Sequence, residues 1–143
     1  KDGRRTSMQK VTFDYFTIDN YDQYSFLRIP KRLMTDDYYA GLSIQSKLLY
    51  GLLLDRMEQT EKNDWYDEQN RAYVIYPLDE MSGDLGVSKR KITDCLNELE
   101  EIDLIERVQR GNGLPNIIYV KKFITDDGAC LPGSGIVPFR VAR

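Results

Sequence analysis

Two short helical patterns lie close together near the middle of the chain, and this spacing restricts the fold more than any other feature. The first pattern covers residues 78–84 and opens with two acidic residues, which stabilise the first turn of a helix. Gly86 suits a turn, and Ser88 is a favourable cap for a second helix that we predict to end near Ile102. Two helices joined by so short a turn are typical of a helix-turn-helix.

The residues that follow predict a β-hairpin. Residues 104–109 and 116–122 are predicted strands, and residues 110–113, with the sequence Arg-Gly-Asn-Gly, form the turn between them. Its glycines permit the positive φ angles that a tight turn requires. A further short strand is predicted at residues 72–76, immediately before the two helices.

A longer apolar helix is predicted to begin after Ser43, a favourable N-cap. Its apolar residues form two rows at four-residue spacing, and two more residues widen the stripe. We therefore expect this helix to be the central core helix, covered on more than one side. The rows are Ile44, Leu48 and Leu52, then Leu49, Leu53 and Met57, and the widening residues are Tyr50 and Leu54.

The resulting order is helix, strand, helix, turn, helix, hairpin, which is the order of a winged helix-turn-helix. The last helix carries one apolar face that we expect in the core, and this face includes Cys95. Residues 59–71 are polar around Trp65 and are predicted to form a loop or a hairpin tip. The apolar face consists of Ile92, Cys95, Leu96 and Leu99.

An added β-hairpin is predicted at the N-terminus, between residues 11 and 29, with its turn at Asp19-Asn20. Pro30 then suits the start of a short helix that ends at Met34. The predicted fold class is therefore α+β, a winged helix-turn-helix with an added N-terminal β-hairpin. The hairpin either pairs between two subunits or covers the core helix, and its aromatic residues are Tyr15, Phe16, Tyr24 and Phe26.

One domain is predicted at residues 11–123. Residues 1–10 are polar and basic and read as an arm, disordered or extended. Residues 124–143 contain two prolines and three glycines and read as an extended linker or tail. No apolar run is long enough to span a membrane and no secretory signal is present, so we expect a cytoplasmic protein with no membrane partner.

The composition excludes several kinds of catalysis. The chain of 143 residues has no histidine, which removes histidine acid–base catalysis, the serine triad and histidine-ligated metals. Cys95 and Cys130 have no disulfide or metal-ligand pattern. Tyr38-Tyr39 looks like the tyrosine pair of rolling-circle nickases, but those enzymes need a histidine pair, so a packed aromatic pair is favoured. We therefore expect no catalytic residue, cofactor or metal, and no enzyme.

Charge placement indicates a binding function. The net charge of −3 disfavours non-specific polyanion binding, so any DNA-binding surface must gather its cations on one face. The helix capped by Ser88 begins with Lys89, Arg90 and Lys91, although the positive end of a helix dipole disfavours cations. A DNA phosphate near Ser88 would compensate for this cost. The alternative is an ordinary solvated first turn.

The hairpin favours the same face. In a helix-turn-helix the start of the second helix enters the major groove. Lys89 and Arg90 would read guanine edges there, and Thr93 and Asn97 lie one and two turns further along the same exposed side of the helix. A wing that contacts phosphate or the minor groove would use basic and polar residues near the turn. The alternative is an ordinary hairpin on a satellite sheet. The hairpin candidates are Arg107, Gln109, Arg110, Asn112 and Lys121.

Several runs together resemble the N-terminal domain of the replication initiator A (RepA) family. They are FTIDNYDQYSFLRIPKRLMTDDYYAGLSIQSKLLYGLLLDRME, NDWYDEQNRAYVIY, LGVSKRKITDCLNELEEIDLIER and GNGLPNIIYVKKF, and the resemblance covers residues 15–123. The family's DNA-contacting helix corresponds to residues 88–97, and its wing to residues 107–121. Pro77 and Leu78 depart from the pattern, because a capping serine or threonine more often opens the first helix of the motif.

The resemblance implies an initiator of theta-type replication on plasmids and conjugative elements of Gram-positive bacteria. It implies binding to double-stranded origin repeats as a homodimer, and host replication proteins as partners through a separate C-terminal domain absent from this chain. One alternative is a transcriptional regulator with the same fold. Another is a winged-helix interaction module that recruits replication proteins without touching DNA, which the acidic total favours and the basic helix start disfavours.

Overall fold

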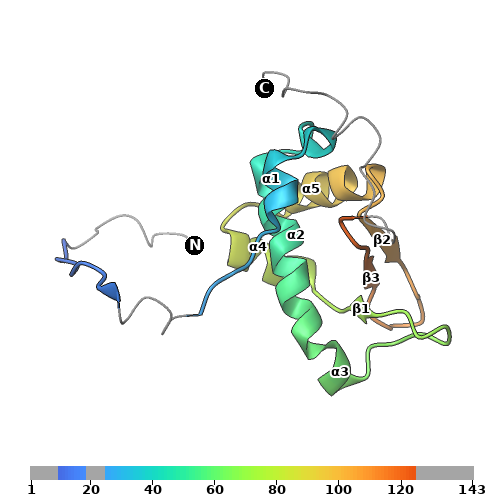
Figure 1. The fold of residues 1–143 in the computed structure, drawn as a ribbon. Helices are drawn as coiled ribbons and strands as arrows, with labels where there is room; N and C mark the ends of the chain where they lie inside the picture. Colours follow the sequence, from blue (N-terminus) through green and yellow to red (C-terminus); the bar gives the residue numbers. More distant parts are fainter. Residues whose placement is uncertain (1–9, 19–24, 125–143) are drawn as a thin grey trace.

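The computed structural model describes residues 10–18 and 25–124 (Figure 1). Within them, every helix is too short or too polar to cross a lipid bilayer. The helices are α1 (Lys31–Thr35), α2 (Ile44–Arg56), α3 (Thr60–Asn63), α4 (Leu78–Leu85) and α5 (Lys89–Glu101), with 3₁₀ turns η2 (Asp37–Tyr39) and η3 (Met57–Gln59). The strands are β1 (Tyr73–Val74), β2 (Ile105–Val108) and β3 (Ile117–Val120).

The three strands form an antiparallel sheet in the order β1-β3-β2. On the central strand, Tyr119 lies opposite Tyr73 of β1 and Glu106 of β2. We call the β2–β3 hairpin the wing. Because β1 and β3 are antiparallel, the tip of the wing lies beside the segment that leads from β1 into α4, and the base of the wing lies at the other end of the sheet. The predicted α+β winged helix-turn-helix is confirmed.

Helix α2 is the central core helix, as predicted, but it buries only one of its two apolar rows. It packs against α4 and α5 (Figure 1). Leu49, Tyr50 and Leu53 are fully buried, whereas Ile44 is 59% exposed and Leu48 is 37% exposed. The prediction that α2 is covered on more than one side is confirmed, because Ser46, Lys47 and Gly51 are buried as well, but the row of Ile44 and Leu48 is not covered. Spacing alone shows that a stripe is apolar, and the neighbouring elements decide which row is covered.

Tyr39 and Tyr50 anchor these helices to the chain after β3. Both rings are buried, and their hydroxyls donate to the backbone carbonyls of Phe123 and Lys121. Tyr38 packs edge-on against Tyr39, with 5.2 Å between the ring centroids. The predicted packed aromatic pair is therefore confirmed.

The predicted N-terminal β-hairpin is not found in the described residues. Residues 10–18 and 25–29 contain no strand, and Phe13, Tyr15 and Ile18 are 84–98% exposed. The predicted turn at Asp19-Asn20 and Tyr24 lie outside the described residues, as do most of the predicted arm and tail and Cys130. Aromatic and β-branched residues favour extended backbone, but a strand also needs a neighbouring strand to pair its amides and carbonyls. Sequence patterning does not supply that neighbour.

The turn of the helix-turn-helix forms as predicted. Helix α4 ends at Gly86, which adopts a left-handed conformation with φ of 75°. The amides of Gly86 and Val87 both donate to the carbonyl of Ser82, and the Ser82 hydroxyl donates to the carbonyl of Val87. At the other end of α4, Pro77 provides no side-chain cap. The first helix of the motif therefore begins at Leu78 despite the missing serine or threonine.

The polar segment before β1 is more ordered than the predicted loop. Its first part continues the α2 direction as η3 and α3, and Asp64 ends α3 in a left-handed conformation. An isolated bridge then pairs Tyr66 with Ala72, which confirms a hairpin tip at residues 67–71. Trp65 packs against the edge of the core.

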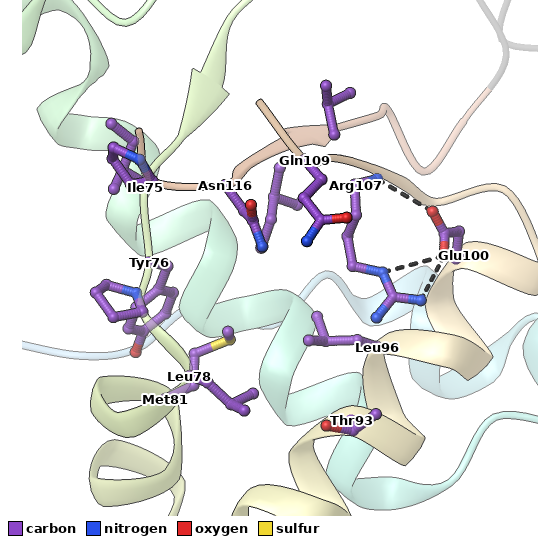
Figure 2. Close-up of a pocket in the computed structure, with 14 residues that line it drawn as sticks. Ile75, Tyr76, Leu78, Met81, Thr93, Leu96, Glu100, Arg107, Gln109 and Asn116 are labelled. Carbon is purple, nitrogen blue, oxygen red and sulfur yellow. Dashed lines mark hydrogen bonds and ion pairs between the residues drawn. The ribbon is translucent and has the colours of Figure 1, made fainter. Parts of the chain in front are cut away.

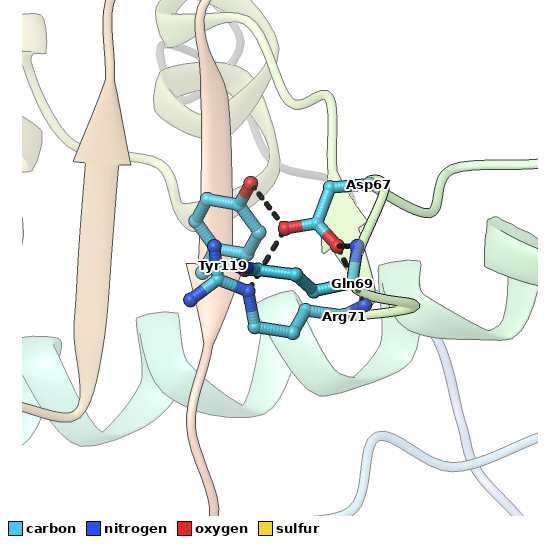
Figure 3. A network of polar contacts seen from close by, with 4 residues as sticks. All are labelled: Asp67, Gln69, Arg71 and Tyr119. Carbon is cyan, nitrogen blue, oxygen red and sulfur yellow. Dashed lines mark hydrogen bonds and ion pairs between the residues drawn. The ribbon is translucent and has the colours of Figure 1, made fainter.

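This hairpin tip is tied to the sheet by Asp67 (Figure 3). The Asp67 carboxylate accepts hydrogen bonds from the amides of Gln69 and Arg71 at 2.9 and 2.8 Å. It also accepts from the Arg71 side chain at 2.8 Å and from the Tyr119 hydroxyl at 2.9 Å. The Arg71 guanidinium lies 5.0 Å from the centre of the Tyr119 ring. One carboxylate therefore organises the loop and holds it on β3.

Replacing Asp67 by asparagine is expected to reduce the loss of stability in acid. The backbone amide of Arg71 and the Arg71, Tyr119 and Gln69 hydrogen bonds outweigh desolvation and lower the pKa of Asp67 from 3.8 to about 2. A group with a lowered folded-state pKa contributes stability that is present above its unfolded pKa and is lost as pH falls through the folded pKa. Thermal unfolding between about pH 4 and pH 2 should therefore show a steeper loss for the wild type than for Asp67→Asn. Glu68→Gln, which removes an exposed carboxylate of the same loop, is the matched control, and equal slopes for wild type and Asp67→Asn would contradict the expectation.

Candidate nucleic-acid interface

The start of α5 is capped as its sequence predicts. The Ser88 hydroxyl accepts a hydrogen bond from the amide of Lys91 at 3.1 Å. Ser88, Lys89 and Arg90 are exposed, and Lys91 is half-buried. The first turn of α5 therefore presents free helix amides and positive charge on one surface.

The three cations of this turn differ in their surroundings. The Lys89 ammonium lies 2.7 Å from the Asp79 carboxylate, at the start of α4, and both side chains are more than half exposed. The Asp79 carboxylate therefore offsets part of the cost of placing cations at the positive end of the α5 helix dipole. A surface pair of this kind contributes only about 0–1 kcal/mol, so Lys89 can exchange Asp79 for another anion at little cost.

Lys91 faces α2 rather than the outer surface, because Glu98 lies two turns along the same side of α5. Glu98 accepts hydrogen bonds from the Ser43 amide at 3.0 Å and the Ser46 hydroxyl at 2.8 Å. Burial raises the pKa of Glu98, but these hydrogen bonds and the nearby Lys91 charge outweigh burial and hold it below its usual value. This network fixes α5 against the start of α2, and it engages Lys91 electrostatically.

Arg90 is the cation of this turn that points away from the protein. It lies on the side of α5 opposite the apolar row, which is fully or almost fully buried at Ile92, Cys95, Leu96 and Leu99. The guanidinium makes no ion pair or hydrogen bond with any other residue that the structure describes. Asp94 and Asn97 lie on the same outer side and are exposed. This side of α5 is the surface that a helix-turn-helix inserts into the major groove.

The tip of the wing is a tight turn, as predicted. Gly111, Asn112 and Gly113 all have positive φ angles, between 53° and 76°. Arg110 crosses the turn, and its Nε donates to the carbonyl of Pro115 at 2.9 Å. The tip is therefore held by a side chain that still carries its positive charge close to the surface.

The structure separates the remaining candidate residues of the wing. Gln109 lies near the tip, whereas Lys121 lies at the base, where its ammonium contacts Asp103 at 2.7 Å. The prediction that Lys121 contacts DNA stays a prediction, and the structure places this residue away from the wing tip. Along either strand of a hairpin, each further residue lies further from the turn. Lys121, eight positions after Gly113, therefore lies at the far end of the sheet.

A cleft of about 660 Å³ separates the wing from α5 and from the segment that enters α4 (Figure 2). Both apolar and polar side chains line it. Sequence reasoning identified Thr93, Arg107 and Gln109 of this lining but missed Leu78, Glu100 and Asn116. The two missed polar residues carried no signal, because Glu100 reads as one of several solvated acidic residues and Asn116 as the start of a strand.

Thr93, Asn97 and Arg107 already have partners inside the protein. The Thr93 hydroxyl donates to the carbonyl of Lys89 at 3.1 Å, one turn earlier. Arg107 donates to Asn97 and to Glu100, as Figure 2 shows for Glu100. These hydrogen bonds lower the pKa of Glu100 below its usual value. The structure therefore brings two predicted DNA contacts, Asn97 and Arg107, into contact with each other.

The fold and this surface define a winged-helix domain whose second helix and wing flank one exposed face. Residues 25–131 match the family described as the replication initiator protein A (RepA) N-terminus, and the chain belongs to this family. A relative from Lactobacillus helveticus, described as a 41 kDa protein, is 31% identical over 86 residues, which cover 60% of this chain. The chain spans about a quarter of that relative, 24% of its length.

Three solved structures are similar in both fold and sequence. One, described as the N-terminal domain of a DNA-binding protein, has a TM-score of 0.66 and 32% identity, and the match covers 82% of this chain and 89% of the other. A Rep–DNA complex has a TM-score of 0.65 and 32% identity, with 80% and 89% covered. A structure described as an MDR initiator has a TM-score of 0.63 and 30% identity, with 80% and 91% covered.

Proposed function

We propose that this domain binds double-stranded DNA at the repeats of a replication origin, as part of a plasmid or mobile-element replication initiator. The observation that carries the proposal is Arg90, which is exposed on the capped first turn of α5 and has no ion pair with another described residue. Membership of the initiator family and the similarity to a Rep–DNA complex support it.

In this proposal the first turn of α5 enters the major groove. Arg90 and Lys89 contact bases or phosphates there, while Arg110 and Asn112 at the wing tip contact the adjacent backbone. The protein acts by binding, without catalysis and without a cofactor or metal. Two copies bind each repeat, and host replication proteins are recruited through parts of the initiator beyond this domain. The domain works in the cytoplasm.

The proposal is tested by selecting tight binders from a library of random-sequence duplexes. We expect the protein to enrich a recurrent sequence, with an affinity that falls steeply as salt rises, because phosphate contacts release counterions. Light scattering of the complex should give two protein chains per repeat. If affinity for the enriched duplex equals that for random duplex and depends weakly on salt, the proposal is wrong. A duplex that stays unshifted at micromolar protein would favour a protein-interaction module instead.

A further inference from the structure

Arg107 uses its Nε and Nη2 donors and its backbone amide inside the protein, between α5 and the wing. Its Nε donates to Glu100 Oε1 at 3.0 Å, and its Nη2 donates to the same oxygen and to Asn97 Oδ1, the latter at 2.7 Å. Its backbone amide donates to Glu100 Oε2 at 3.1 Å. A side chain on the edge of the wing is thus joined to two residues of α5 that lie about one turn apart.

The position of β2 explains why the glutamate is needed. Strand β2 is at the edge of the sheet, so the Arg107 amide faces away from β3 and needs another acceptor. Glu100 accepts this amide with one oxygen and the guanidinium with the other. The carboxylate therefore fixes both the distance between the wing and α5 and the direction of the Arg107 side chain.

The contact with Asn97 determines which way round its amide group lies. A guanidinium has donors and no acceptor, so the Asn97 atom that faces Arg107 must be the oxygen. The NH2 group of Asn97 then lies on the side of the amide away from Arg107, and it makes no hydrogen bond with another described residue. On the outer side of α5, Asn97 therefore presents donors.

We propose that Arg107 is a positioning residue that fixes Asn97 as a hydrogen-bond donor, so that Asn97 reads a guanine edge in the major groove and Arg107 itself contacts no DNA. This inference rests on the proposed function. Guanine presents two acceptors there, N7 and O6, whereas bidentate recognition of adenine requires the asparagine oxygen to accept from N6. In this protein Arg107 already uses one of the two lone pairs of that oxygen, which disfavours the bidentate pairing with adenine.

The experiment uses the duplex that the wild type enriches from the random library, with each guanine replaced in turn by 7-deazaguanine, which lacks the N7 acceptor. We expect one replacement to weaken wild-type binding by about tenfold and to leave Asn97→Ala unaffected, because that variant has already lost the contact. Arg107→Gln should lose the same discrimination, with an unchanged dependence of affinity on salt.

Two results would overturn the inference. If Arg107→Gln reduces the salt slope by about one unit, Arg107 contacts a phosphate. If every 7-deazaguanine replacement affects wild type and Asn97→Ala equally, Asn97 does not read guanine N7. Failure of the wild type to enrich any duplex would instead refute the proposed function, and this inference with it.

Glu100→Gln is a second variant that keeps the Arg107 charge but weakens the carboxylate that directs it. A positioning role predicts that Glu100→Gln also loses guanine discrimination. If Arg107 instead binds phosphate, releasing it should tighten binding to all duplexes, and that result would overturn the inference. Thermal unfolding of each variant separates a loss of fold, which would affect all duplexes equally, from the loss of one base preference.

Discussion

Replacing Arg90 by alanine is expected to weaken binding to the enriched duplex by roughly 10- to 100-fold, or about 1–3 kcal/mol. Arg90 is exposed on the first turn of α5, and no described residue neutralises it, unlike Lys89 beside Asp79. Its removal should therefore cost DNA contacts and no contacts within the fold. Fluorescence anisotropy with labelled duplex at several salt concentrations measures the loss.

Lys62→Ala is the matched control for Arg90→Ala. Lys62 is an exposed cation on α3, outside the surface that α5 and the wing tip form. The Lys62→Ala substitution removes the same unit charge as Arg90→Ala, so a general electrostatic effect would weaken the DNA binding of both variants equally. Unchanged binding for Arg90→Ala, or an equal loss for both, would contradict a major-groove role for this turn.

Replacing Leu49 by alanine is expected to lower the free energy of unfolding by about 2–5 kcal/mol. Leu49 is fully buried on the side of α2 that faces the other helices, so truncation loses buried apolar area and leaves a cavity. Domains of this size have a total stability of roughly 5–15 kcal/mol, so the variant should be partly unfolded well below the wild-type melting temperature. Urea denaturation followed by circular dichroism measures the change.

Ile44→Ala, on the same helix, is expected to change stability by less than about 0.5 kcal/mol. The two residues are equally apolar in sequence, but Ile44 is 59% exposed. A loss at Ile44 comparable to that at Leu49 would show that the first turn of α2 is covered in solution, for example in a dimer. Repeating the measurement at several protein concentrations distinguishes that case.

Sequence was most informative where structure depends on local interactions. The cap of α5 needs only Ser88 and an amide three residues later, and the turn after α4 needs a left-handed residue at Gly86. The glycines of the wing turn act in the same way. These features recur wherever the same few residues stand at the same spacing, so the helix-turn-helix and the hairpin were predictable.

Contacts between distant residues were not predictable in the same way. The N-terminal aromatic residues looked like strands, but a strand requires a partner that patterning does not specify. The apolar rows of α2 looked equivalent, although only the row that contains Leu49 is buried. Asn97, Glu100 and Arg107 lie on two elements joined by a turn, and no motif indicated that they would meet.

The order of elements, the helix ends, the wing turn and the cationic start of α5 were determined by the sequence itself, because each depends on residues within one turn of one another. Tertiary structure alone decided which of those cations has no ion pair among the described residues, how Arg107 turns the Asn97 amide, and that Lys121 lies away from the wing tip. These outcomes depend on where separate elements pack, and packing is set by the whole core rather than by any local pattern.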